Sequence, residues 1–268
     1  MIPNILSIAG SDPSGGAGIQ ADIKAISARG GYAMAALTAL TAQNTRGVQG
    51  VQMVPPDFVA DQIAAIRADI RIDAVKIGML GTAAIIQAVA EALQGLEAPV
   101  VLDPVMVAKG GDRLLAAEAV AALRDRLLPM AAVITPNLPE AADLLQTAPA
   151  TDRDGMTRQA QALREAGAQT VLLKGGHLEG TDSPDLLVTS RGAHWLPGPR
   201  HATPNTHGTG CSLSAALACE LGHGHPLPGA AARAKAWLAD AIATADRLQV
   251  GGGHGPVHHF HALPLPAA

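Results

Sequence analysis

Short apolar runs alternate with segments of helical period along almost the whole chain, and this alternation restricts the possible folds more than any other feature. The run NILSIA near the start is typical of a buried strand, and the segment after it places Ile19, Ile23 and Ile26 on one face of a helix. The same strand-then-helix order recurs with the strands DAVKIG, APVVLDP and AAVITPN, and TVLLKGG is interpreted as one more strand. Such repetition predicts an α/β fold with a mostly parallel central sheet and helices on both faces.

Further segments complete this prediction. Residues 35–40, AALTAL, are interpreted as the second strand, which places Gln43 in the loop after it. LLVTS with AHWLP predicts a hairpin, a Gly-Thr-Gly turn precedes an alanine-rich helix, and the last helix is expected from Ala232 to Leu248. No linker is long or polar enough to divide the chain, so we expect a single domain over residues 1–268.

Charge and cysteine content exclude several classes of protein. The formal net charge of -4 argues against a basic nucleic-acid-binding surface. No apolar run reaches the roughly 18 residues of a membrane span, and the N-terminus lacks the pattern of a secretory signal. On one helix, Cys211 and Cys219 would lie about 12 Å apart, too far for a disulfide. We therefore expect a cytoplasmic protein with free thiols and no membrane or nucleic-acid partner.

The loops after the strands are expected to carry the chemistry, because ligands bind beyond the carboxyl ends of parallel strands. In the first loop, GSDPSGGAGIQAD, Gly16, Gly18 and Ala21 fit the G-x-G-x-x-G/A pattern of dinucleotide-binding proteins. The second strand, however, ends without the acidic residue that would hold a ribose. A tight packing turn, or a backbone wall that a flat ligand can approach closely, remains as the interpretation.

Charged side chains stand at the ends of apolar strands. Burying the Asp103 carboxylate there would cost free energy without a cation or phosphate-bound magnesium beside it. Alternatively, Asp103 is a turn-forming residue, since it precedes Pro104. Lys174 is expected to meet an anion or to form a buried ion pair. Asn137 and Glu140 have the spacing of a helix cap and its capping-box partner. The same position would let Glu140 hold magnesium through water.

The segment NTHGTGCSLSAAL is the most informative. Gly208, Thr209 and Gly210 lead into a helix whose first N–H groups lack partners, which makes the turn a candidate anion site. No lysine follows in the G-x-x-x-x-G-K-[ST] pattern, so the turn is not a P-loop of that kind. Cys211 lies in the first helical turn, where we expect its thiol pKa to be lowered.

Taken in order, the motifs identify a family. From IAGSDPSGGAGIQAD through TALTAQNT, VKIGML, VLDPVMVAKGGD, TPNLPEA, KGGH and NTHGTGCSLSAA to GGGHGPVHH, nearly the whole chain resembles bacterial hydroxymethylpyrimidine and phosphomethylpyrimidine kinases. These enzymes are a branch of the ribokinase-like superfamily. The resemblance implies a three-layer sandwich and a kinase that uses ATP and Mg²⁺. It would phosphorylate hydroxymethylpyrimidine and then its monophosphate for thiamine biosynthesis.

The resemblance also implies roles for individual residues. Gln43 would pair with the edge of the pyrimidine. Four residues would wall the pocket: Gly10, Ala17, Met79 and Val105. The magnesium and phosphate network would comprise Asp103, Glu140 and Asn137, with Lys174 on the ATP phosphates. The anion hole would be formed by Gly208, Thr209 and Gly210. We further expect a homodimer.

Cys211 stands where most of the superfamily has a catalytic Asp. As a thiolate it would accept the proton of the primary alcohol in the first transfer. The second acceptor is already a phosphate anion and needs no base. We therefore expect Cys211→Ala to slow the first transfer more than the second.

Three competing functions predict different behaviour. A pyridoxal or pyridoxine kinase would share the ATP site but take a different flat heterocycle. A non-catalytic pyrimidine-binding protein would bind without phosphoryl transfer, and Asp103, Lys174 and Cys211 together argue against it. An NAD-binding protein is disfavoured by the missing ribose acid. The tail GGGHGPVHHFH lacks a clear metal-ligand spacing and is expected to be a surface segment.

Overall fold

The computed structural model describes residues 1–106 and 117–263 of the chain. The part of the VLDPVMVAKGGD motif from residue 107 onward lies outside the described residues. The elements run in the order β1 (Asn4–Ala9), α1 (Gly18–Ala28), β2 (Tyr32–Leu37), β3 (Ala39–Asn44), β4 (Gly47–Met53), α2 (Pro56–Asp69), β5 (Ala74–Ile77), α3 (Ala83–Ala92), β6 (Val100–Leu102), α4 (Ala117–Ala122), a π-helical turn (Leu123–Leu127), β7 (Val133–Ile134), α5 (Leu138–Leu145), α6 (Arg153–Glu165), β8 (Val171–Lys174), β9 (Asp185–Thr189), β10 (Gly192–Leu196), α7 (Thr209–Gly222), α8 (Leu227–Ala243) and a 3₁₀ turn (Ala245–Arg247).

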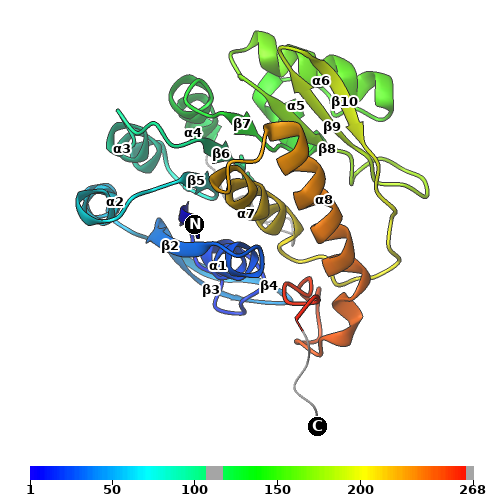
Figure 1. Ribbon diagram of the computed structural model, residues 1–268, viewed down its shortest axis with the longest axis horizontal. Coiled ribbons are helices and arrows are strands. Elements are labelled where there is room, and N and C mark those ends of the chain that lie inside the picture. The colour runs from blue at the N-terminus through cyan, green and yellow to red at the C-terminus, as the bar shows by residue number, and fades with distance from the viewer. Residues whose placement is uncertain (107–116, 264–268) are drawn as a thin grey trace.

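An eight-stranded sheet forms the middle layer, in the order β10-β9-β8-β7-β6-β5-β1-β2. The pairs from β2 to β8 are parallel, and β9 and β10 add an antiparallel edge. Helices α1, α7 and α8 cover one face, whereas α2 to α6 cover the other (Figure 1). The predicted mostly parallel α/β sandwich is therefore confirmed, as is the β9–β10 hairpin.

The core is aliphatic, as a chain with 2% aromatic residues requires. On one face of the sheet, alanines of α7 and α8 let the helices approach each other and the strands closely. On the other face, larger side chains such as Ile63, Ile86 and Leu127 fill the space. The two layers together enclose strands that are buried on both sides, which explains why β6 appears as a continuous apolar run.

The prediction of one strand over residues 35–40 is wrong. The chain turns at Thr38, whose buried hydroxyl donates to the Met79 carbonyl at 2.6 Å, so the run is divided between β2 and β3. β3 then pairs with β4 in a separate two-stranded sheet. Gln43 consequently lies in β3 and not in a loop.

Two further boundaries differ from the sequence prediction. The last long helix spans Leu227–Ala243 and not Ala232 to Leu248, and a 3₁₀ turn follows it. It begins five residues early because Pro226 and Pro228 suit a first helical turn. The C-terminal tail is only partly a surface segment, since Val257 and His259 are buried. Both cysteines are free, as predicted. Over the described ranges, no helix is long and apolar enough to cross a membrane.

Candidate active site

One cavity of about 510 Å³ opens at the carboxyl ends of the central strands, between the starts of α1 and α7. Every site residue proposed from the sequence lines it. They are Gly10, Ala17, Gln43, Met79, Asp103, Val105, Asn137, Glu140, Lys174, Gly208, Thr209, Gly210 and Cys211. Residues from seven separate loops, strands and helix starts therefore meet in a single space, while their individual roles stay predictions.

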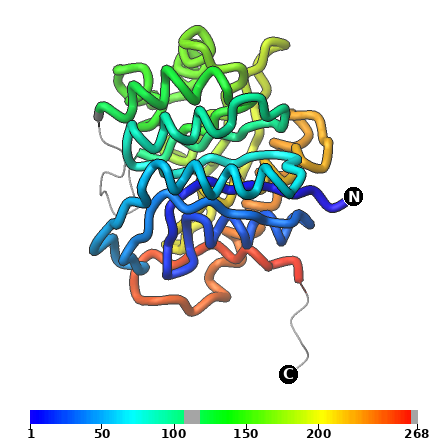
Figure 2. The backbone as a smooth tube through the Cα atoms, turned by 90° about the vertical axis from the view of Figure 1, so that its left-hand side faces the viewer, coloured from blue at the N-terminus to red at the C-terminus, as the bar shows by residue number. Residues whose placement is uncertain are grey.

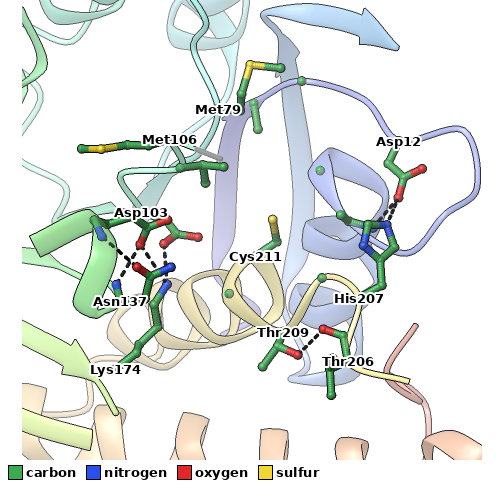
Figure 3. A pocket seen from close by; sticks show the side chains of 18 of the residues that line it. Asp12, Met79, Asp103, Met106, Asn137, Lys174, Thr206, His207, Thr209 and Cys211 are labelled. Carbon is green, nitrogen blue, oxygen red and sulfur yellow. Dashed lines mark hydrogen bonds and ion pairs between the residues drawn. The ribbon is translucent and has the colours of Figure 1, made fainter. Parts of the chain in front are cut away.

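A charged cluster occupies one side of this cavity (Figure 3). The Lys174 ammonium lies 2.9 Å from Asp103 Oδ1 and 3.8 Å from Glu140 Oε2. Asp103 also accepts hydrogen bonds from Thr135 at 3.1 Å and from Ser214 at 3.2 Å. The ion pair that the sequence allowed for Lys174 is therefore present, and the same residue lines the cavity, where contact with an anion stays a prediction.

The cluster separates the pKa values of its two carboxyl groups. Burial opposes ionisation of Asp103, but the neighbouring Lys174 and Lys76 ammonium groups hold its pKa below the ordinary value. Burial instead raises the pKa of Glu140 to about 7, and the Asp103 charge adds to this effect. Burial disfavours the charge of Lys174, yet Asp103 and Glu140 raise its pKa above normal. Asp103 and Lys174 are thus permanently charged at neutral pH, whereas Glu140 is poised to titrate.

Glu140 is held by the start of α5. Asn137 Oδ1 accepts from the Glu140 N–H at 2.8 Å, and Glu140 Oε2 accepts from the Asn137 N–H at 2.7 Å. This is the reciprocal capping box that the sequence predicted. The capping role and a position facing the cavity coexist in Glu140, because a carboxylate can accept more bonds than the cap uses.

The start of α7 forms the floor of the cavity. Gly208 adopts a left-handed conformation with φ of 75°, and a Cβ there would lie 1.7 Å from the Gly16 carbonyl oxygen. A Cβ on Gly210 would lie 3.2 Å from the Lys174 nitrogen, so this ammonium group sits beside the first turn. No acceptor among the described residues pairs with the N–H groups of Gly210 or Cys211. The turn thus offers donors and positive charge to an anion.

Cys211 lies in the middle of the cavity, between the charged cluster and the pair Asp12–His207 (Figure 3). Its sulfur accepts from the N–H of Gly18, the first residue of α1, and is influenced by the Lys76 ammonium. Burial outweighs both and raises the pKa of the thiol to about 11. The expectation of a lowered pKa is therefore wrong, since desolvation of the thiolate exceeds the stabilisation from two helix starts and a lysine.

The opposite wall is apolar and suits a flat ring. A Cβ on Gly10 would lie 2.6 Å from Met79 Cε, so the glycine makes room for the methionine. Gln43 reaches into the cavity from β3, and its amide lies 3.5 Å from His207 Nε2. Ala17 and Val105 complete the part of this wall proposed from the sequence.

Sequence reasoning missed several polar residues that line the cavity, and three of them form close ion pairs: Asp12, Lys76 and His207. Asp12 Oδ2 lies 2.7 Å from His207 Nε2 and also accepts from the Ala17 N–H at 2.8 Å. Burial would raise the pKa of Asp12, but hydrogen bonds from His207 and Ser14 hold it well below normal. This pair ties the glycine-rich loop to the loop before α7.

Lys76 is another missed residue. It is fully buried in β5, and its ammonium lies 2.7 Å from Asp22 Oδ2, which also accepts from Ser7 Oγ at 2.6 Å. Burial opposes its charge, but Asp22 and Cys211 raise the pKa of Lys76 above normal. A lysine inside the otherwise apolar run DAVKIG was the available signal.

The residues present fit a magnesium ion that arrives with a nucleotide. Asp103 and Glu140 offer the oxygen ligands that Mg²⁺ prefers, and such an ion usually keeps several waters and phosphate oxygens. Across residues 1–106 and 117–263, no group of three or more His, Cys, Asp or Glu side chains could hold a metal by itself. Two carboxylates beside an anion site are the pattern expected when phosphates supply the remaining ligands.

Comparisons with known proteins agree with this geometry. The family model described as phosphomethylpyrimidine kinase matches residues 12–258. The hydroxymethylpyrimidine/phosphomethylpyrimidine kinase of Escherichia coli (strain K12) is 54% identical, over 97% of this chain and 98% of that protein.

Solved structures show the same fold. The ADP complex of Bacillus subtilis pyridoxal kinase superposes with a TM-score of 0.90 at 37% identity, covering 98% of this chain and 99% of that one. A phosphomethylpyrimidine kinase from Clostridium difficile gives a TM-score of 0.79 at 39% identity, over 90% and 99% of the two chains. A layered kinase fold, a cavity at the strand ends and near-complete sequence matches all lead to one assignment: this chain belongs to the phosphomethylpyrimidine kinase family.

Proposed function

We propose that this protein transfers the γ-phosphoryl group of ATP to the hydroxymethyl group of 4-amino-5-hydroxymethyl-2-methylpyrimidine, and then to the resulting monophosphate, in thiamine biosynthesis. The observation that carries the proposal is the single cavity in which a flat apolar wall faces a cation-lined helix start. Homologues named as kinases of these two substrates support it. A ring placed against Met79 would direct its hydroxymethyl group toward the start of α7.

Phosphoryl transfer depends mainly on positioning and on stabilising negative charge. The free N–H groups at the start of α7 and the Lys174 ammonium would stabilise the charge that spreads over the phosphoryl oxygens. Asp103 and Glu140 would hold magnesium through its waters, and the ion would neutralise phosphate charge. Asp103 also keeps the Lys174 ammonium beside the first turn of α7.

The heterocycle wall supports a pyrimidine as the acceptor. The Gln43 amide offers both a donor and an acceptor, which matches the neighbouring ring nitrogen and amino group of the aminopyrimidine. Pyridoxal phosphorylation is the second candidate, because a pyridoxal kinase shares the fold at a TM-score of 0.90.

Incubation with ATP, magnesium and each alcohol in turn tests these two candidates. Mass detection of a pyrimidine monophosphate followed by a diphosphate is the expected result. Turnover of pyridoxal with no pyrimidine product would contradict the proposal and favour the second candidate. Binding of the pyrimidine without any transfer would instead indicate a non-catalytic protein.

The raised pKa of Cys211 predicts how the first transfer depends on pH. If the thiolate accepts the alcohol proton, its fraction grows about tenfold per pH unit while the pH stays well below the pKa of about 11. The rate of the first transfer should therefore rise between about pH 7 and about pH 9. The second transfer, measured with the monophosphate as substrate, should lack this rise because its acceptor is already an anion.

The variant Cys211→Ala provides the control. It should slow the first transfer more than the second and should remove the rise with pH. Cys219→Ala is the matched substitution, since Cys219 is the other free thiol and is fully buried away from the cavity. Equal slowing of both transfers in Cys211→Ala would exclude the thiol as the base.

Magnesium dependence, a single domain over residues 1–268, a homodimer and a cytoplasmic location stay predictions. Loss of transfer on adding a chelator, with recovery on adding magnesium in excess, is the expected result for the first of these.

A further inference from the structure

The C-terminal segment, residues 251–261, contacts two separate parts of the chain that carry cavity-lining residues. The His254 N–H donates to the Thr45 carbonyl at 2.9 Å, in the turn between β3 and β4. The Gly255 N–H donates to Asn205 Oδ1 at 3.1 Å, and the His207 N–H donates to the Gly255 carbonyl at 3.0 Å. Figure 2 shows this segment, in red, passing below the first strands and helix. It therefore contacts both the hairpin that carries Gln43 and the loop before α7.

His259 is the residue of this segment that reaches α7. Its side chain is buried, with a relative exposure of 4%, and Nε2 lies 2.9 Å from Ser212 Oγ. Trp237 of α8 packs against the same ring with centroids 6.3 Å apart. Ser212 is fully buried in the first turn of α7. The histidine is thus fixed between two helices, behind the start of α7 and outside the cavity lining.

The hydrogen atoms in this contact can be assigned. Ser212 Oγ lies 2.8 Å from the Gly208 carbonyl oxygen, which can only accept, so the hydroxyl hydrogen points to Gly208. The ring nitrogen must then donate to the remaining lone pair of the hydroxyl. Burial lowers the pKa of His259 to about 4, so the ring is neutral and places its one hydrogen on Nε2. The direction of donation is His259 to Ser212 to Gly208.

This chain of hydrogen bonds ends on the peptide unit that opens the anion site. The Gly208 carbonyl and the Thr209 N–H belong to one planar trans peptide, so they point in opposite directions. Two hydrogen bonds from Ser212 hold the carbonyl inside the helix, at 2.8 Å from the amide and 2.8 Å from the hydroxyl. The Thr209 N–H thereby points toward the N-terminal end of the helix, where its contact with the Thr206 carbonyl is long, at 3.4 Å. A phosphate oxygen can share such a donor.

We propose that His259 is a positioning residue for phosphoryl transfer, which holds the left-handed Gly208 and the Thr209 N–H in place through Ser212. The inference rests on the proposed function. It assigns a role to the histidine-rich tail, which lies beyond the residues that touch substrate or nucleotide.

The test compares His259→Leu, His259→Gln and His261→Leu. His261 packs on the same Trp237 at 6.1 Å, but no hydrogen bond in the described ranges links it to α7. We expect His259→Leu to lower kcat about tenfold, the effect of one lost hydrogen bond in the transition state. The KM for the pyrimidine should stay within about twofold, because the ring wall is untouched. His259→Gln should recover most of the rate by donating from its amide, and His261→Leu should leave kcat unchanged.

Ser212→Ala tests the same chain of hydrogen bonds from its other end. It decides the question by itself if His259→Leu fails to fold. Ser212→Ala and the double variant Ser212→Ala/His259→Leu should have the same kcat. The effects of two residues that act through one another are not additive. Effects that multiply in the double variant, or equal losses in His259→Leu and His261→Leu, would overturn the proposal. So would a lower melting temperature with an unchanged kcat per folded molecule.

A second measurement separates this inference from the proposed function. ADP binding by calorimetry needs no acceptor, and we expect His259→Leu to raise the Kd for ADP about fivefold. If the wild type binds ADP but phosphorylates no pyrimidine, the proposed function fails while this readout still decides the role of His259. An unchanged Kd together with an unchanged kcat would exclude a positioning role.

Discussion

Lys174→Met is expected to lower kcat for both transfers by about a hundredfold to a thousandfold. This is the typical loss when an enzyme loses one preorganised group that stabilises negative charge in the transition state. The ammonium lies beside the first turn of α7 and 2.9 Å from Asp103, with 14% of its side chain exposed. Methionine keeps much of the chain length but removes the charge. Single-turnover rates with saturating ATP, followed by mass detection of the products, provide the measurement.

The same substitution outside the cavity separates catalysis from folding. Lys235 pairs with Asp185 at 2.8 Å and is 13% exposed, so it matches Lys174 in burial and in having one close carboxylate. Lys235→Met should lose some stability but keep its kcat. Retention of more than about a tenth of the wild-type kcat in Lys174→Met would contradict a role for this charge in transfer.

Lys76→Met is expected to reduce the free energy of unfolding by about 3–5 kcal/mol, because it leaves the Asp22 carboxylate buried without its partner. Both side chains are completely buried. Moreover, Asp22 Oδ1 has no hydrogen-bond partner among the described residues, so Lys76 and Ser7 provide all the compensation for this charge. Urea unfolding followed by circular dichroism gives the change directly.

Two further variants identify the cause of that loss. Lys76→Met with Asp22→Leu removes both charges, and we expect it to recover most of the stability. Arg71→Met breaks the exposed pair with Asp73 and should change the free energy of unfolding by no more than about 1 kcal/mol. A loss of about 1 kcal/mol or less in Lys76→Met would contradict the expectation that a buried Asp22 charge is left without a partner.

Much of the fold could be predicted because the local sequence patterns agree with the elements that form in the folded chain. The strand at Asn4–Ala9 and the helix at Gly18–Ala28 follow from apolar period alone. The start of α5 follows from the spacing of Asn137 and Glu140, which specify a local hydrogen-bond pattern. The residues of the candidate site could be named because several motifs occur in one order.

The differences arise where long-range contacts decide. The division at Thr38 depends on a hydrogen bond to Met79, forty-one residues away, which no local pattern predicts. Likewise, the pKa of Cys211 depends on the depth at which its sulfur is enclosed, and a first-turn position alone suggests the opposite direction. His259 could not be placed either, because its partner in α7 lies forty-seven residues earlier in the sequence.

The two-stranded sheet of β3 and β4 has a consequence for how such enzymes diversify. It carries Gln43 outside the eight-stranded sheet, whereas Lys174 and Asp103 end or follow strands of the main sheet. If Gln43 binds the ring as proposed, exchanges of side chains along this small ribbon would alter which ring is accepted and leave the eight-stranded sheet unchanged. Selection for a new ring substrate would then act on the ribbon, while the residues proposed to bind the phosphates are retained.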